Sequence, residues 1–274
     1  MATLTIGKDQ LYYEVHGKGE PLLLAHGLGG NHAIWYQQVA VLAKAYQVIT
    51  FDHRGFGNST DHARLGRSGF VSDLKALIDH LQLKKVVLIG QSMGGGTAIT
   101  FANQYPERVS GLMIADSLHG LEENAQVAEI MDKARAETAQ LSQLDRVLGA
   151  AFKQQNPQLA MLYSQISSFN HTDKSNLTGQ YADNKVSPQQ LGKHDFPILF
   201  VAGQDDILFP IEAIRMVQEQ VPDSFIVEFD HCGHSAFFEK PVEFNDSLLS
   251  FLQMAELAPL NQSVHSNSAG YIHP

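Results

Sequence analysis

Residues 86–96 constrain the fold more than any other stretch, because an apolar, β-branched run there leads into a serine that stands between glycines. Residues 84–89 have the composition of a strand buried on both faces, and residues 97–105 continue as a predicted helix. Ser92 therefore falls at a strand-to-helix turn, which is the context that a G-x-S-x-G pattern needs. The stretch predicts a nucleophile elbow.

The residues around Ser92 have a specific physical use. Gly90 and Gly94 let neighbouring backbone approach a serine held in a strained conformation, which exposes its hydroxyl beyond the sheet edge. A helix that begins at Met93 adds its N-terminal dipole and backbone N–H groups beside developing negative charge. A glycine-rich turn around a serine also arises by chance or for packing, so the surroundings decide the interpretation.

Strands and helices alternate along most of the chain. Residues 3–6 and 11–15 flank Gly7-Lys8-Asp9 and predict a β-hairpin. Further strands are predicted at 21–25, 47–51, 84–89, 109–115, 196–202 and 225–229. Helices are predicted at 31–45, with Asn31 as its cap, and at 70–81, 97–105, 211–220 and 242–257. The alternation predicts an α/β fold with a mostly parallel central sheet flanked by helices.

This alternation stops after Asp116. We find no convincing strand pattern from residue 119 to 193, where three stripes of apolar residues have helical spacing. The stripes are Val127, Ile130, Met131 and Ala134; Leu141, Leu144, Leu148 and Phe152; and Leu159, Leu162, Ile166 and Phe169. We expect a helical cap insertion at 118–193, a core domain made of 1–117 and 194–257, and a polar tail at 258–274. The polar stretch 171–190 is expected to be the flexible part of the insertion.

Composition limits the kinds of partner. The 274 residues are 44% hydrophobic, which is enough to bury a large core. A formal charge of −10 and the lack of any Lys/Arg run argue against nucleic acid and anionic membranes, so we expect a small-molecule partner. A single cysteine, Cys232, excludes an internal disulfide. Without a signal-like N-terminus or an apolar run of about 18 residues, the chain is expected to be soluble and cytoplasmic.

Two polar loops follow late strands, at the sheet edge where open α/β sheets bind ligands. The loop 203–210 offers Asp205 and Asp206, and the loop 231–234 offers His234. A serine hydroxyl needs a base at neutral pH, imidazole suits that task, and the imidazole needs an orienting carboxylate. The order of Ser92, then an aspartate, then a histidine is the order of the α/β-hydrolase arrangement.

Each of these polar residues also has an alternative interpretation. Asp205 or Asp206 could cap the helix that begins near Pro210, and Asp116, at the end of its own strand, is a rival orienting acid. The residues of 231–234 could bind a metal, but adjacent ligands on so short a loop give poor tetrahedral geometry. His26 is expected to brace a buried loop.

Several of these motifs together resemble the α/β-hydrolases, in the branch of capped esterases, lactonases and carbon–carbon hydrolases. The motifs are His26-Gly27-Leu28-Gly29, Asp52-His53-Arg54-Gly55-Phe56-Gly57-Asn58-Ser59, Gly90-Gln91-Ser92-Met93-Gly94-Gly95, Tyr105-Pro106-Glu107-Arg108-Val109, Gly203-Gln204-Asp205-Asp206 and Gly233-His234. The resemblance implies Ser92 as nucleophile and His234 as base. It also implies Asp206 as the acid, four residues before the turn proline, and an oxyanion hole formed by the N–H groups of Leu28 and Met93.

The resemblance narrows the substrate only in part. Ser92 speaks against the epoxide hydrolases and haloalkane dehalogenases of this fold, which carry aspartate there. Residues 92–109 are similar to hydrolases of aromatic ring-fission products, but the chain departs from them at 28–32 and at Ser235, where they have tryptophan. Residues 26–59 look closer to enol-lactonases and small carboxylesterases, and a cofactor-free perhydrolase side activity is compatible with the triad.

We therefore expect a serine hydrolase that cleaves a small, mostly apolar carboxylic ester or lactone, with no metal or organic cofactor. The alternatives are a carbon–carbon hydrolase of a ring-fission diketo acid and a ligand-binding receptor with the same fold. Arg135 and Arg146 could bind the carboxylate of a diketo acid, although their spacing gives no sign that they converge. The sequence predicts no particular oligomeric state.

Overall fold

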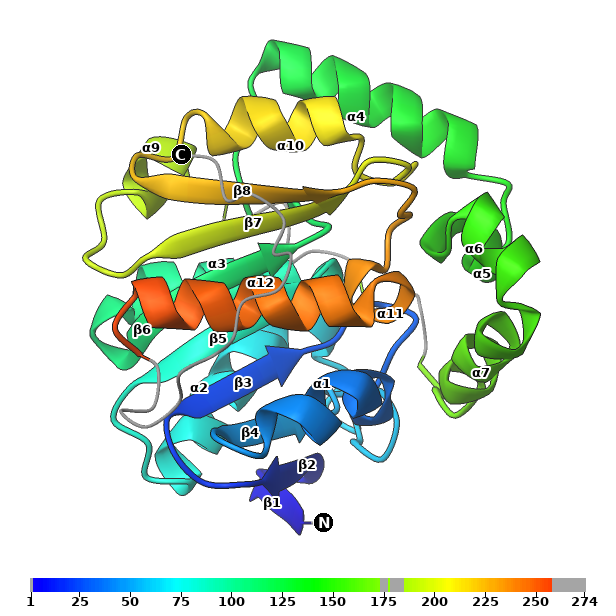
Figure 1. The fold of residues 1–274 in the computed structure, drawn as a ribbon. Helices are drawn as coiled ribbons and strands as arrows, with labels where there is room; N and C mark the ends of the chain where they lie inside the picture. Colours follow the sequence, from blue (N-terminus) through cyan, green and yellow to red (C-terminus); the bar gives the residue numbers. More distant parts are fainter. Residues whose placement is uncertain (1, 173–176, 178–184, 258–274) are drawn as a thin grey trace.

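The structure, a computed structural model, describes residues 2–172, 177 and 185–257. These residues form an eight-stranded sheet in the order β1-β2-β4-β3-β5-β6-β7-β8 (Figure 1). The strands are β1 (Ala2–Ile6), β2 (Asp9–His16), β3 (Pro21–Ala25), β4 (Gln47–Phe51), β5 (Val86–Gln91), β6 (Val109–Ala115), β7 (Ile198–Gly203) and β8 (Ser224–Phe229). The pairs β1·β2 and β2·β4 are antiparallel and the others are parallel, which confirms the predicted sheet.

Helices cover both faces of the sheet. One face carries α2 (Phe70–His80), α3 (Met93–Gln104) and α10 (Ile211–Gln218), and the other carries α1 (Tyr36–Leu42), α11 (Ala236–Glu239) and α12 (Pro241–Met254). In β5, Leu88 packs into the first of these cores, while Val87 and Ile89 pack into the second. Because the strand is buried on both faces, it has an unbroken apolar sequence and no alternation.

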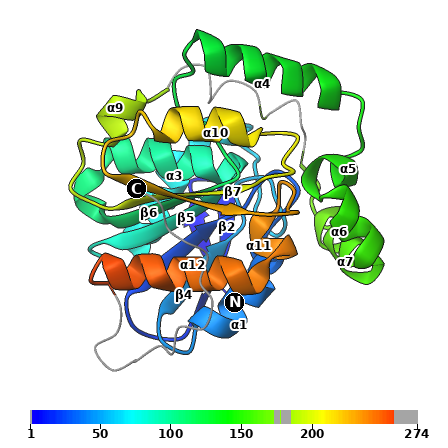
Figure 2. The ribbon, with the colours of Figure 1, turned by 45° about the horizontal axis from the view of Figure 1, so that its top comes forward.

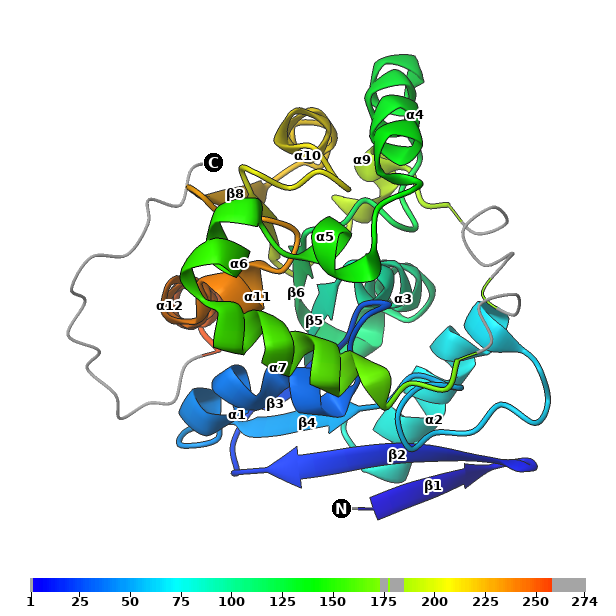
Figure 3. The same ribbon diagram turned by 90° about the vertical axis from the view of Figure 1, so that its right-hand side faces the viewer.

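Between β6 and β7, the described residues up to 172 form the helices α4 (Ala125–Thr138), α5 (Gln143–Val147), α6 (Ala150–Gln155) and α7 (Pro157–Ser168). We call these the inserted helices. α4 runs beside α10, and α5 to α7 lie beyond the ends toward which the strand arrows point (Figures 1 and 2). Seen from that side, α5, α6 and α7 stand in front of the sheet (Figure 3). The inserted helices therefore face the carboxyl ends of the parallel strands.

The second predicted stripe, from Leu141 to Phe152, does not form one helix. The chain leaves the helical conformation at Leu148, with φ −122° and ψ 135°, and restarts at Gly149, the N-cap of α6. The N–H of Gly149 donates to Oε1 of Glu239 at 3.1 Å. Leu148 and Phe152, on either side of the break, pack in the same core. Their apolar spacing therefore continues across the break, and for this reason periodicity alone predicted a single helix.

The helix predicted at 31–45 is also divided. A 3₁₀ turn, His32–Trp35, precedes α1, and the side chain of Asn31 caps it by accepting from the N–H of Ala33 at 3.0 Å. A short helix, α9 (Pro188–Leu191), lies within the stretch that we expected to be flexible, most of which falls outside the described residues, as does the tail. The domain boundaries remain predictions. In the described part of the chain no helix has the length and apolarity to cross a membrane.

Candidate active site

Ser92 lies at the sharp turn between β5 and α3, with φ 49° and ψ −115°. Its N–H donates to the carbonyl oxygen of Ala115 at 3.0 Å, which ties the turn to the neighbouring strand β6. A Cβ atom at Gly90 would lie 2.6 Å from the carbonyl oxygen of Gly94, so a side chain at Gly90 would push strand and helix apart. A non-glycine residue in this backbone region is strained, and such strain is concentrated at functional sites.

His234 and Asp206 are hydrogen-bonded partners. Nδ1 of His234 lies 2.9 Å from Oδ2 of Asp206, and both side chains are buried. Oδ1 of the same carboxylate accepts from the N–H groups of Leu208 at 2.7 Å and Phe209 at 3.1 Å. Because a carboxylate only accepts, Nδ1 is the donor, and Nε2 of the neutral imidazole is left to accept a proton.

One cavity joins the predicted site residues. Ser92 and His234 line it together with Leu28 and Met93, and its volume is about 200 Å³. The inserted helices contribute further apolar and aromatic residues to the same wall, namely Met131, Val147 and Tyr163. The cavity thus brings together the expected nucleophile, the expected base and the two expected oxyanion-hole residues, and the inserted helices partly enclose it.

The rival acids have other environments. Asp205 is exposed, in contrast to its buried neighbour Asp206. Asp116 is buried, but its carboxylate accepts from the N–H groups of Gly203 at 3.1 Å and Ala236 at 3.0 Å. Burial, together with the nearby carboxylate of Asp206, raises the pKa of Asp116 well above its ordinary value. Asp116 therefore holds the end of β7 to the start of α11, and Asp206 is the carboxylate bonded to His234.

Sequence reasoning missed three residues around His234. Nε2 of Gln91 donates to the carbonyl oxygen of His234 at 2.9 Å, and the ring of Phe209 stacks on the imidazole with centroids 5.6 Å apart. Glu239 accepts from the N–H of Gly233 at 3.0 Å as well as from that of Gly149. Gln91 lies inside the elbow motif and could have been found there, whereas nothing in the sequence around Glu239 indicates its contacts.

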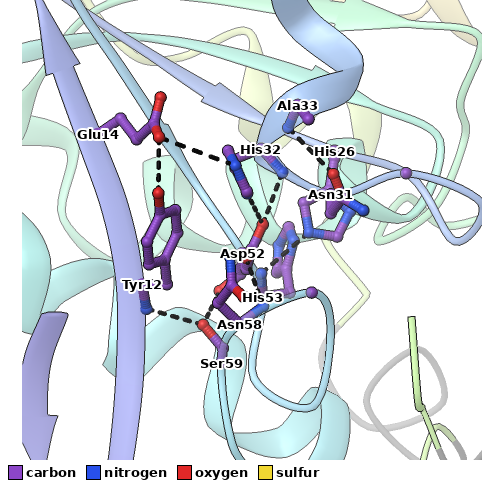
Figure 4. Close-up of polar contacts among 12 residues, drawn as sticks. Tyr12, Glu14, His26, Asn31, His32, Ala33, Asp52, His53, Asn58 and Ser59 are labelled. Carbon is purple, nitrogen blue, oxygen red and sulfur yellow. Dashed lines mark hydrogen bonds and ion pairs between the residues drawn. The ribbon is translucent and has the colours of Figure 1, made fainter. Parts of the chain in front are cut away.

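Polar contacts brace the loops next to Leu28 (Figure 4). Asp52 accepts from the backbone N–H of His32 at 2.6 Å, from its Nδ1 at 2.7 Å and from the N–H of Asn58 at 2.8 Å. Nε2 of His26 accepts from the N–H of His53 at 2.9 Å, and its Nδ1 bonds the carbonyl oxygen of Gly27 at 2.8 Å. Desolvation by burial lowers the pKa of His26 to about 4. His26 is thus a neutral residue that braces a loop.

The arginines of the cavity are a departure from expectation. Arg135 and Arg146, whose spacing gave no sign of convergence, both line the cavity that contains Ser92, and Arg67 joins them from the 3₁₀ turn Gly66–Gly69 before α2. Spacing could not reveal this because α4 and α5 are separate helices whose relative placement depends on tertiary packing.

Comparison with known proteins identifies the family. Residues 20–241 match the family model described as the alpha/beta hydrolase fold, so the chain belongs to this family. It is 25% identical over 260 residues to the "Putative carbamate hydrolase RutD" of Agrobacterium fabrum, covering 90% of this chain and 99% of that protein.

Two further relatives extend the range of named activities. The chain is 26% identical over 257 residues to the 2-hydroxy-6-oxo-6-(2'-aminophenyl)hexa-2,4-dienoic acid hydrolase of Metapseudomonas resinovorans, covering 90% of this chain and 88% of that protein. Among solved structures, it is similar to a thermophilic esterase from Thermogutta terrifontis, with a TM-score of 0.77, 24% identity, and coverage of 93% of this chain and 99% of that one. The protein is therefore a hydrolase of this fold.

Proposed function

We propose that this protein is a serine hydrolase that cleaves a small carboxylic ester or lactone through an acyl-enzyme on Ser92. The observation that carries the proposal is the bond between His234 and Asp206 beside the cavity that Ser92 lines. Acyl transfer requires a nucleophile, a base whose ring nitrogen is free to accept a proton, and a carboxylate that orients the base.

In the proposed mechanism Ser92 attacks the carbonyl carbon while Nε2 of His234 takes its proton. Asp206 holds the imidazole in the required tautomer and stabilises its protonated form. The N–H groups of Leu28 and Met93 donate to the oxyanion, and Met93 does so from the first turn of α3, where the helix dipole favours negative charge. His234 then protonates the leaving alcohol, and water repeats the cycle on the acyl-enzyme.

Cavity size supports a small substrate. A volume of about 200 Å³, partly enclosed by the inserted helices, has little room for a long acyl chain unless these helices move. Apolar side chains from both sides, such as Leu208 and Val147, favour an apolar body next to the scissile carbonyl. The proposed chemistry uses no metal or organic cofactor, and the single buried cysteine fits a cytoplasmic enzyme.

A carbon–carbon hydrolase that acts on a ring-fission diketo acid is the second candidate. Arginines on the cavity wall favour it, because such a substrate carries a carboxylate. The resemblance to the hydrolase from Metapseudomonas resinovorans points the same way. The same triad can serve both reactions, so the substrate decides between them.

The test is kcat/KM of the purified protein across one panel. The panel holds 4-nitrophenyl esters from acetate to palmitate, an aliphatic lactone, a carbamate, and one ring-fission diketo acid. We expect short esters or the lactone to be the best substrates. A maximum at long chains, or a diketo acid turned over roughly 100-fold faster than any ester, would contradict the assignment, since kcat/KM ratios measure which transition state the site binds best.

A further inference from the structure

The charge on the wall of the Ser92 cavity is opposite to the charge of the whole chain. The formal net charge of the protein is −10. Arg67, Arg135 and Arg146 nevertheless line the cavity, and Glu123 is the carboxylate among the lining residues on that wall. A local excess of positive charge in an enclosed site attracts anionic ligands and disfavours cationic ones.

These arginines differ in their partners. Nη2 of Arg135 lies 2.8 Å from Oδ1 of Asp132 and 3.5 Å from Oε2 of Glu123, so its charge is already balanced. The side chain of Arg146 has a single hydrogen bond among the described residues, from Nη2 to Oε1 of Gln143 at 3.2 Å. Its Nε is buried without a hydrogen-bond partner. A guanidinium has five N–H donors, so most of those of Arg146 have no acceptor in the described part of the chain.

Arg146 lines the same cavity as Ser92 and His234. Nε2 of its partner Gln143 lies 3.0 Å from where a Cβ atom on Gly29 would be, and Gly29 directly follows Leu28. Arg146 and His234 together line a second, adjacent cavity of about 380 Å³. Arg146 therefore borders both the cavity that contains Ser92 and the neighbouring cavity, and His234 lines both with it.

We infer that Arg146 binds a carboxylate on the substrate, so that the natural substrate is an ester or lactone that carries a second, ionised acid group. This inference rests on the proposed function for the reaction and adds the substrate class. A planar guanidinium bonds a carboxylate through two parallel N–H···O bonds, which gives both affinity and orientation. A neutral substrate would bury the same donors without acceptors, at a cost in binding.

Two matched substrate pairs test this inference. Each pair differs only by a carboxylate in place of a carboxamide: monomethyl glutarate against methyl glutaramate on the acyl side, and 4-acetoxybenzoate against 4-acetoxybenzamide on the alcohol side. The readout is the ratio of kcat/KM for the acid to that for the amide, in wild type, Arg146→Gln and Arg146→Lys. Arg135→Gln is the control, because it removes a cavity charge that is already paired with Asp132.

For wild type we expect a ratio of roughly 10 or more in at least one pair, because charge-assisted hydrogen bonds are about twice as strong as neutral ones. Arg146→Gln should bring that ratio close to about 1, Arg146→Lys should retain part of it, and Arg135→Gln should change it by less than about twofold. A wild-type ratio near 1, or equal losses for Arg146→Gln and Arg135→Gln, would overturn the inference.

Binding in the absence of turnover separates this inference from the proposed function. Calorimetry with glutarate and glutaramate on the wild-type protein and on Arg146→Gln measures carboxylate recognition directly. We expect glutarate to bind wild type at least about 10-fold more tightly than Arg146→Gln, with little difference for glutaramate. If all four esters are left intact while this difference holds, the proposed function is wrong and the carboxylate site stands. If neutral esters are cleaved but glutarate binds wild type no more tightly than Arg146→Gln, the proposed function stands and the carboxylate site is wrong.

Discussion

Asp206 holds His234 with one carboxylate oxygen and its own turn with the other. Oδ2 lies 2.9 Å from Nδ1 of His234, and Oδ1 accepts from the N–H groups of Leu208 and Phe209. Asp206 does not cap the helix α10, whose N-cap is Pro210 without a side-chain bond, but it braces the turn before that helix while it bonds His234. The backbone bonds keep the carboxylate from rotating away, so the imidazole is held in one orientation.

Asp206→Asn should lower kcat by roughly 10²-fold or more, because the amide can favour the wrong imidazole tautomer against Ser92. Asp205→Asn is the matched control on the same turn, and its exposed side chain predicts a much smaller effect. The measurement is kcat for both variants on the best ester of the panel. Equal losses for the two, or a larger loss for Asp116→Asn, would contradict the assignment of Asp206.

Glu239→Gln should destabilise the fold by about 1–3 kcal/mol, because one of the backbone N–H groups of Gly149 and Gly233 loses its acceptor in a buried site. Burial raises the pKa of Glu239, and the hydrogen bonds from these N–H groups oppose that shift. Urea denaturation measures the change. Glu243→Gln, exposed in the first turn of α12, is the control and should cost little. A Glu239→Gln protein as stable as this control would show that the contact contributes nothing.

Arg54→Met should destabilise by about 3–5 kcal/mol, since it leaves buried carboxylates without their counter-charge. Arg54 bonds Asp9 at 2.6 Å and Asp73 at 2.7 Å, and its side chain is 4% exposed. Arg215→Met breaks an exposed pair with Glu228 and should cost about 1 kcal/mol or less. Urea denaturation of both variants gives the comparison, and similar costs for the two would refute the role of burial.

Stability should fall on acidification because His26 is held neutral. Burial lowers its pKa from 6.5 to about 4, so the unfolded chain binds a proton in this range that the folded protein does not. This contribution is complete above pH 6.5 and is lost as the pH falls through about 4, on the order of 3 kcal/mol. His53, whose pKa burial also lowers, acts in the same direction.

Unfolding free energies at pH 7, 6, 5 and 4 test this. The His26→Gln variant should lose less stability between pH 7 and 4 than wild type, while the exposed His62→Gln variant should follow the wild-type curve. Parallel curves for wild type and His26→Gln would mean that His26 does not carry the effect.

Much of the core could be predicted because its signals are local. A strand such as β6 is an unbroken apolar run, and its predicted bounds, 109–115, match the observed ones. The elbow is also local: the left-handed backbone of Ser92 and the close contact at Gly90 follow from residues adjacent in the sequence. Motif order pointed to an aspartate of the 203–210 loop and a histidine of the 231–234 loop. The resemblance to the α/β-hydrolases implied Asp206 and His234, whose side chains are hydrogen-bonded across 28 positions of sequence.

The inserted helices could be predicted only in part, since their contacts are tertiary. The break between α5 and α6 coincides with a bond from Gly149 to Glu239, a residue 90 positions away. The convergence of Arg67, Arg135 and Arg146 on one cavity likewise depends on how α4, α5 and the 3₁₀ turn Gly66–Gly69 pack. No spacing rule in the sequence carries that information, because it concerns separate elements.

The most direct test of the central claim is kcat/KM of Ser92→Ala relative to wild type on the best ester of the panel, in a variant shown by denaturation to be folded. The account predicts a fall on the order of 10⁴ to 10⁶, because in the proposed mechanism the hydroxyl oxygen of Ser92 forms the ester bond of the acyl-enzyme. A folded Ser92→Ala protein that keeps more than about a tenth of the activity would contradict it, because no acyl-enzyme can form at position 92 without the serine hydroxyl.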